Sequence, residues 1–334
     1  MEYIDNGLVD AIIGGHKHNF VHDWIKDTPV VSSIDSGLYT NILYLPFKKI
    51  NGKYQVIREE VKIEGPLPNC EKIFINTKIC DEVSNEEEYL KSGSLVSYKY
   101  HGTQIKLPKK LDSIINKHYP KYKEYSEDII CTIYGVNHTL NGRQNNGDDY
   151  VPNLITDIIK IKTNSDFAIL NYGALRTSWT VGNLTKAQIK SMMPFEDYFC
   201  IANVTGKELR QILSVIEIGQ KAYYPTSGLK VIMSKSGKKK HFKDVKFWKN
   251  GKEIDVEDNK FYIMGSIDYI IESYGDDFKN LADNGFEFRD VKCEDGKEEL
   301  NWNERIIKAL KELGNINLND YKNSSFPRLV EVTE

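Results

Sequence analysis

Short apolar stretches broken by polar turns fill the first part of the chain, and this pattern predicts strands rather than helices. Residues 8–13 form an apolar run that ends at Gly14-Gly15, as in a buried strand that opens into a loop. Residues 28–33 predict a second short strand. Residues 40–63 predict two strands joined by Asn51-Gly52, because Asn-Gly between alternating segments is the strongest short signal of a hairpin.

The following stretch is less regular. Residues 64–107 contain a Gly-Pro-Leu-Pro sequence and three consecutive glutamates at 86–88, so we expect an irregular segment with little helix. Residues 109–128 are highly charged and predict a connector that is helical up to about Pro120. The pattern predicts a first domain over residues 1–107, a partly helical linker over residues 108–128, and a second domain over residues 129–334.

Longer periodic segments mark the second domain. Helices are predicted over residues 152–163, 184–194 and 301–314. A further helix is predicted after Thr205, which forms a capping box with Glu208, and the last helix has Asn301 as its cap and Gly314 as its stop. Strands are predicted at the start of segments 166–176, 198–217 and 261–278, and as a meander over residues 228–254. Strands and helices mix without strict alternation, which predicts the α+β fold class.

Composition narrows the range of partners. Hydrophobic residues make up 40% of the 334 residues, enough for real cores, and the formal net charge of −3 gives no basic field for nucleic acid binding. No run approaches the roughly 20 apolar residues of a transmembrane segment. The five cysteines are odd in number and far apart, so at least one is free unless it pairs between chains, and the pattern favours reduced thiols. Cys70 and Cys80 are able to close one loop if the chain is secreted.

Two histidines in a glycine loop are the first candidates for chemistry. His16 and His18 follow the apolar run and Gly14-Gly15, and ligands at positions i and i+2 can point to the same side of a cavity. Neutral imidazole binds zinc, manganese or iron well. The pair is also compatible with an ordinary surface loop, so both interpretations stay open at this point.

The second domain carries the other candidates. Arg176 is able to bind a carboxylate or phosphate through its planar fork, Asn171 a polar ligand edge, and Phe195 the face of a planar ring. The alternatives are a surface ion pair for Arg176 and a core position for Phe195. The sequence Tyr-Gly-Asp-Asp-Phe at residues 274–278 is typical of an ordinary turn, with a polar ligand contact as the alternative.

The order of these motifs resembles one family. The sequence VDAIIGGHKH followed by TPVVSSIDSGLYTNILYL is similar to the end of a calcineurin-type metallophosphoesterase domain of the 5′-nucleotidase and UDP-sugar hydrolase family. The sequences NLITDIIKIKTNSDFAILNYGALRTSWTVGNL, MMPFEDYF, YPTSGLKV and ESYGDDFKNL resemble the C-terminal substrate domain of that family, in the same order. The resemblance covers residues 8 to about 280, apart from about 64–128. It implies the C-terminal remnant of a metallophosphoesterase β-sandwich, followed by a mixed α/β substrate domain.

The resemblance implies roles for particular residues. The family holds two divalent metal ions, zinc, manganese or similar, and the glycine–histidine loop supplies one ligand to each, here His16 and His18. In the substrate domain, the resemblance implies that Asn171 and Arg176 bind the nucleoside of a nucleotide and that Phe195 stacks on its base. An acid in the late glycine loop, here Asp276, contacts the ribose.

This sequence also departs from the family. The second stacking aromatic falls near Ile270, with Tyr269 beside it, and Arg143 lies about two residues out of register with a second substrate arginine. The other metal motifs of the family, Asp-x-His, Gly-Asp-x-x-Asp and Gly-Asn-His, have no counterpart, and neither does its catalytic histidine. This chain therefore holds no catalytic residue of the family.

We accordingly expect the C-terminal part of a nucleotide phosphate monoester hydrolase, N-terminally truncated and inactive by itself. The alternatives are a catalytically inactive nucleotide-binding protein, or a relative of UDP-sugar hydrolases or 2′,3′-cyclic phosphodiesterases. The sequence does not decide the compartment. The resemblance implies an extracellular or secretory location for a full-length protein that follows its family.

Overall fold

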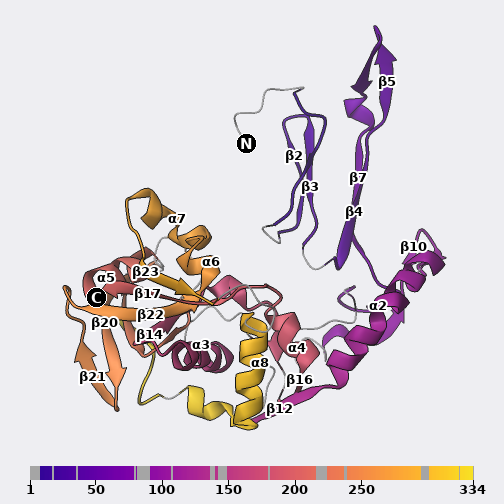
Figure 1. The fold of residues 1–334 in the computed structure, drawn as a ribbon. Helices are drawn as coiled ribbons and strands as arrows, with labels where there is room; N and C mark the ends of the chain where they lie inside the picture. The colour runs from indigo at the N-terminus through magenta and orange to yellow at the C-terminus, as the bar shows by residue number, and fades with distance from the viewer. Residues whose placement is uncertain are drawn as a thin grey trace. The chain divides into compact units, whose positions relative to one another are not determined.

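The computed structural model describes residues 8–16, 19–34, 37–78, 80, 91–106, 108–135, 140–141, 149–179, 181–215, 224–236, 239–294, 301–322 and 324–333. The chain forms two compact units, residues 1–115 and 116–334. The boundary lies within the long helix α2 (Lys109–Glu127), which Figure 1 traces in magenta. The expectation that this helix ends near Pro120 is wrong, because the helix continues through the proline. A proline removes one backbone hydrogen bond and kinks or breaks a helix, and here the helix persists.

A small three-stranded sheet lies at the start of the first unit. Its order is β1 (Ile12–Ile13), β3 (Thr28–Ser32) and β2 (Val21–Ile25), with β1 parallel and β2 antiparallel to the central strand. All five residues of β3 are buried. The expectation of a buried strand over residues 8–13 is wrong, because β1 is a two-residue edge strand and Ile13 is 81% exposed. An apolar run does not reveal whether a strand is central or lies at an edge.

The rest of the first unit consists of short antiparallel pairs. Asn51-Gly52 joins β5 (Phe47–Ile50) and β6 (Lys53–Val56) with positive φ angles of 50° and 80°, as in the predicted hairpin. Residues 64–107 contain more strand than expected. The strands of this region are the end of β7 (Lys62–Pro68), then β8 (Lys72–Phe74), β9 (Leu95–Ser97), β10 (Lys99–Tyr100) and β11 (Thr103–Gln104). Before it lie β4 (Tyr39–Tyr44) and the 3₁₀ turn η1 (Arg58–Glu60).

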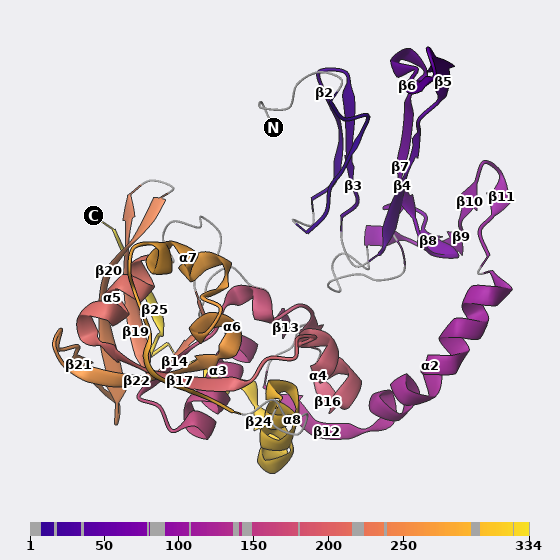
Figure 2. The same cartoon turned by 45° about the horizontal axis from the view of Figure 1, so that its top comes forward.

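A five-stranded mixed sheet is the centre of the second unit. Its order is β18 (Thr226–Ser227), β14 (Phe167–Ile169), β22 (Phe261–Ile267), β17 (Phe199–Thr205) and β23 (Arg289–Cys293). Only β14 and β22 run parallel within it. Four helices accompany the sheet, namely α3 (Tyr150–Thr163), α5 (Gly206–Val215), α6 (Asp268–Ile271) and α7 (Gly275–Asp283). Helix α3 packs along β14, β17, β18 and β22 through its buried apolar face, and Figure 2 shows it beside β14, β17 and β22.

Further sheets complete this unit. One consists of β16 (Gly182–Thr185), β12 (Ile129–Tyr134) and β24 (Asn315–Asn317), and another of β21 (Lys252–Asp255), β20 (Lys239–Lys249), β19 (Leu229–Ser236) and β25 (Leu329–Thr333). The remaining elements are β13 (Leu140–Asn141), β15 (Ser178–Trp179), α4 (Lys186–Met192), α8 (Trp302–Leu313), η2 (Tyr172–Ala174) and η4 (Leu318–Tyr321). Helix α8 packs against both α3 and α4 (Figure 1). This mixture of sheets and helices confirms the α+β fold class.

The predicted helix ends are present. The Glu208 carboxylate accepts the backbone N–H of Thr205 at 2.7 Å, and the Thr205 hydroxyl accepts the N–H of Glu208 at 3.3 Å, which completes the capping box of α5. Asn301 accepts the N–H of Asn303 at 2.9 Å, and Gly314 ends α8 with φ of 67°. These local signals are confirmed because they depend only on residues a few positions apart.

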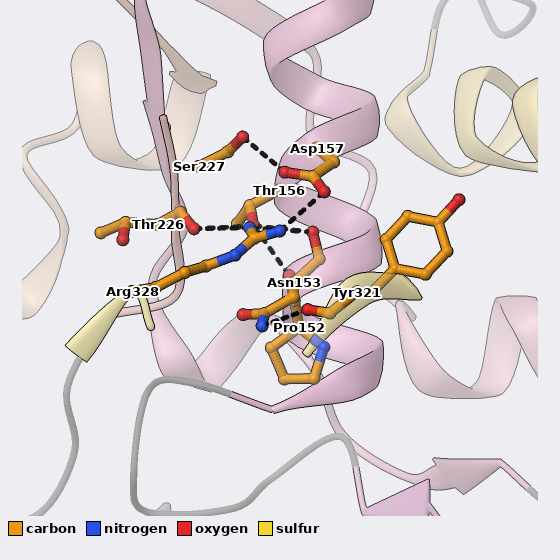
Figure 3. Close-up of polar contacts among 8 residues, drawn as sticks. All are labelled: Pro152, Asn153, Thr156, Asp157, Thr226, Ser227, Tyr321 and Arg328. Atoms are coloured by element: carbon orange, nitrogen blue, oxygen red, sulfur yellow. Dashed lines mark hydrogen bonds and ion pairs between the residues drawn. The ribbon is translucent and has the colours of Figure 1, made fainter. Parts of the chain in front are cut away.

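Arg328, the residue before strand β25, connects that strand to helix α3 by hydrogen bonds. Its guanidinium donates to the carbonyl of Thr226 at 2.8 Å, to the carboxylate of Asp157 at 2.7 Å and to the carbonyl of Asn153 at 3.3 Å (Figure 3). The Asn153 amide in turn donates to the carbonyl of Tyr321 at 2.6 Å. One side chain thus joins β25, β18 and α3.

The cysteines differ from the sequence expectation. Cys70 forms a disulfide with Cys80, and Cys200 forms one with Cys293. Cys131, in the middle strand of the sheet β16–β12–β24, is a free and buried thiol. The preference for reduced thiols is therefore wrong, because β17 and β23 bring Cys200 and Cys293 opposite each other across 93 positions of sequence.

Candidate functional site

Strand β14 and helix α4 bring two of the candidate residues together. The buried strand β14 ends at Ile169 and leads through the 3₁₀ turn η2 to Arg176, whose backbone N–H donates to the carbonyl of Met192 at 2.7 Å. Phe195 follows α4 directly after Pro194. The guanidinium carbon of Arg176 consequently lies 5.0 Å from the centre of the Phe195 ring, within the range of a cation–π contact.

Phe195 is not a core residue. The residue is 36% exposed, whereas its neighbours Met192, Met193 and Phe199 are buried. The alternative interpretation of Phe195 as core is therefore wrong. An aromatic ring held at the surface beside a guanidinium is suited to stack on a planar ligand.

Asn171 stands at the start of η2 with a polar atom that lacks a partner. Its side-chain oxygen is buried and accepts no hydrogen bond from any residue that the structure describes. Leaving a buried polar group without a partner costs about 1–3 kcal/mol. A ligand donor bound at Asn171 would remove this cost, which fits the role expected for this residue.

An acid pair near Phe195 escaped the sequence analysis. Burial, together with the nearby Asp268 carboxylate, raises the pKa of Asp197 to about 7. Asp268 itself accepts the backbone N–H of Tyr198 at 2.8 Å. A perturbed acid next to a candidate site is itself a functional indication, and no spacing rule in the sequence reveals it.

The second stacking position expected from the family falls at Ile270, beside Tyr269. Ile270 is fully buried in the core and is unable to face a ligand. Tyr269 precedes it on the short helix α6 and is half-buried. Tyr269 as a substitute stacking residue stays a prediction. Residue 143, with the out-of-register arginine, lies outside the described residues.

The late acidic segment is the start of a helix rather than a turn. Tyr274 has φ of 57°, and helix α7 begins at Gly275. Asp276 therefore lies in the first turn of α7, and its side chain lies outside what the structure describes. Its predicted contact with ribose stays a prediction.

The histidine loop provides no metal site among the described residues. His16 lies three residues after β1, is exposed and has φ of 66°, and His18 lies outside the described residues. Within the ranges that the structure describes, no three His, Cys, Asp or Glu side chains gather to hold a metal ion. Because each such ion needs about four ligands, the described residues do not fit a two-metal site by themselves.

Comparison with known proteins finds a family match within the second unit. Residues 132–283 match the family model for the 5′-nucleotidase C-terminal domain. This part of the second unit is thus similar to a 5′-nucleotidase C-terminal domain. Over 96 residues, 28% of this chain and 8% of the relative, the sequence is 30% identical to the endonuclease YhcR of Bacillus subtilis (strain 168).

Solved 5′-nucleotidases share the fold. A 5′-nucleotidase precursor from Thermus thermophilus matches 97% of this chain with a TM-score of 0.60 at 15% identity, and 60% of its own length is covered. A 5′-nucleotidase-like structure from Staphylococcus aureus matches 97% of this chain with a TM-score of 0.56 at 12% identity, and 56% of its length is covered. This chain thus spans about 60% of the first of these relatives. None of the helices in the described part of the chain has the length and apolar character needed to cross a bilayer.

Proposed function

We propose that the second unit binds the nucleoside part of a nucleotide, and that the protein serves the hydrolysis of nucleotide phosphate monoesters. The exposed Phe195 ring beside the Arg176 guanidinium carries this proposal, because the pair lies in a domain of the 5′-nucleotidase family. In the proposal, Phe195 stacks on the base and Arg176 binds a polar or anionic group of the nucleotide. Asn171 accepts a hydrogen bond through its buried oxygen.

Two further contacts belong to the proposal. Asp276 binds the ribose from the first turn of α7, and Tyr269 supplies the second aromatic surface. Both follow from the family resemblance and from the positions of α6 and α7 in the chain. Tyr269 replaces the stacking position at Ile270, which is buried.

The hydrolytic centre in the proposal holds two divalent metal ions, zinc or manganese, with His16 and His18 each contributing a ligand. Such a pair of ions activates water and neutralises charge on a phosphoryl group. The described residues supply too few ligands for this centre, so we assign no catalytic step to a side chain of this chain. Hydrolysis by the whole protein requires further ligands.

A nucleotide-binding role without catalysis is the second candidate. It is favoured by the location of Asn171, Arg176 and Phe195, which all lie in the second unit. Titration of the protein with nucleotide in the presence of a chelator separates nucleotide hydrolysis from nucleotide binding without catalysis. Metal-independent binding with no phosphate release after metal is added back would favour the second.

The two disulfides also bear on location. Disulfides persist in oxidising compartments and are rare in the cytosol. We therefore infer that the protein works outside the cytosol, in an extracellular or secretory compartment.

Calorimetric titration of the full chain with AMP, UMP and ribose 5-phosphate tests the binding proposal. Phe195→Ala should weaken binding of the two nucleotides by about 1–3 kcal/mol and leave ribose 5-phosphate unaffected, because only the nucleotides carry a base. Phe261→Ala is a matched control, since Phe261 is an exposed ring with the Arg289 guanidinium 5.0 Å from its centre. Equal nucleotide affinity in both variants would refute the stacking role.

A further inference from the structure

The backbone of Phe195 is held by two buried donors. Its carbonyl oxygen accepts the indole N–H of Trp302 at 2.8 Å and the amide N–H of Asn303 at 2.9 Å. Trp302 is fully buried and Asn303 nearly so. Both lone pairs of this carbonyl are therefore occupied, which fixes the orientation of the main chain from which the exposed ring projects.

The same helix end holds the next residues of the segment. The backbone N–H of Trp302 donates to the carbonyl of Asp197 at 2.8 Å, and Tyr198 forms a β-bridge with Asn301. Residues 301–303, at the start of α8, thus contact residues 195–198 in antiparallel order. The loop that carries Phe195 is therefore held by main-chain and side-chain bonds from one helix end.

Helix α8 is itself firmly placed. The carboxylate of Glu304 pairs with the ammonium groups of Lys190 at 2.7 Å and Lys186 at 3.4 Å, both on α4. Helix α4 also carries Met192, which accepts the backbone N–H of Arg176. The two partners of the cation–π contact are therefore fixed through the same pair of helices.

Asn303 uses only the donor side of its amide at this position. Its side-chain oxygen is buried and has no hydrogen-bond partner within the described residues. An apolar residue of similar size would leave no unpaired oxygen here, but it would also remove the donor to the Phe195 carbonyl. The amide is thus present at a position where only its N–H is used.

From these contacts we propose that Trp302 and Asn303 are positioning residues for nucleotide binding, which set the Phe195 ring in the orientation that stacks on the base. The inference rests on the proposed function of Phe195. It adds two residues that lie beyond the matched family segment at 132–283 and come more than a hundred positions after Phe195. Neither residue touches the nucleotide in this proposal.

The test measures dissociation constants of the full chain for AMP and for ribose 5-phosphate by calorimetry. Asn303→Leu and Trp302→Phe each remove one donor and retain most of the side-chain volume. Each should weaken AMP binding by about threefold to tenfold, the range of an aromatic stacking contribution, and leave ribose 5-phosphate unchanged. Ile307→Val, at a buried position on the same helix, is the control and should change neither constant.

A double-mutant cycle with Phe195→Ala separates positioning from a general structural effect. In the Phe195→Ala background, Asn303→Leu should have no further effect on AMP binding, because the ring whose position it sets is gone. A loss that persists in that background, or that extends to ribose 5-phosphate, would overturn the inference. Unchanged AMP affinity in Asn303→Leu and Trp302→Phe, with Phe195→Ala still weakened, would overturn the inference alone. Unchanged affinity in Phe195→Ala itself would overturn the proposed function.

Discussion

The Arg176 guanidinium lies 5.0 Å from the centre of the Phe195 ring, although the two residues come from different segments on either side of α4. The backbone N–H of Arg176 bonds to the end of α4, and the Phe195 carbonyl bonds to the start of α8. The contact is thus determined by main-chain anchors as well as by the side chains. A ring held in this way loses little conformational freedom when a ligand binds, which favours affinity.

Arg176 should not be replaceable by lysine. Arg176→Ala is expected to weaken AMP binding by about tenfold, and Arg176→Lys should recover only part of the loss, because an ammonium group lacks the planar fork and stacks poorly on a ring. Calorimetric titration at fixed salt measures both. Arg289→Lys, at the matched pair with Phe261, should have no effect. Full affinity in Arg176→Lys would show that only the charge matters.

The raised pKa of Asp197 should appear as a pH dependence of stability. Its pKa is about 7 in the folded protein, against about 3.9 in an unfolded chain, so the folded state binds this proton more tightly. The free energy of unfolding should therefore fall as pH rises from about 4 to about 7. Above that range, this group should cause no further change in it. Asp197→Asn should remove this part of the fall.

Urea unfolding of wild type and variant at pH 5 and pH 8 measures the effect of Asp197. The difference between the two proteins should be larger at pH 8, with the variant more stable. Asp283→Asn, at an exposed position on α7, is the control and should follow the wild type at both values. Parallel behaviour of Asp197→Asn and wild type would contradict a raised pKa.

The Cys200–Cys293 disulfide should stabilise the second unit. Replacing both residues by serine is expected to lower its free energy of unfolding by about 2–4 kcal/mol, because the crosslink restricts the unfolded chain. Replacing Cys70 and Cys80 should leave the unfolding of the second unit unchanged, since that pair lies in the first unit. Thermal unfolding with and without reductant measures both effects. Equal loss from the two replacements would count against the assignment.

Arg328 should contribute more to stability than Lys246 of β20, whose side chain is 29% exposed and pairs with a largely exposed carboxylate. Arg328→Met leaves the Asp157 carboxylate without its guanidinium partner and removes the bonds to α3 and β18, so we expect a loss of about 3 kcal/mol. Lys246→Met breaks an exposed ion pair with Asp255 and should have no measurable effect. Urea unfolding compares the two. A similar small loss in both variants would mean that the network around Arg328 adds little.

Local signals made several elements predictable from sequence. The Thr205–Glu208 capping box and the Asn51-Gly52 hairpin depend on residues within a few positions, and both are confirmed. The prediction of a buried strand over residues 8–13 is wrong, because the burial of a strand depends on the elements that pack around it and not on its own sequence. The predicted end of helix α2 near Pro120 is wrong, because a proline lowers the stability of a helix without necessarily ending it.

The site was predictable only as a set of residue types. Motif order brought Arg176 and Phe195 into one cluster, and the structure places them in contact. Trp302, Asn303 and the acidic Asp197 were missed, because their significance depends on tertiary contacts over long sequence separations or on burial. A tryptophan and an asparagine at the start of a helix look like a core residue and a cap.

Cys131 is a free, buried thiol whose chemical labelling can measure local opening of the second unit. Burial raises the pKa of its thiol to about 11 and hides it within β12, between β16 and β24, so reagents in solution reach it only when this sheet opens. The other four cysteines are tied in disulfides. The rate at which a thiol reagent labels the native protein should therefore report the opening of this sheet, and labelling with and without nucleotide would show whether binding changes that rate.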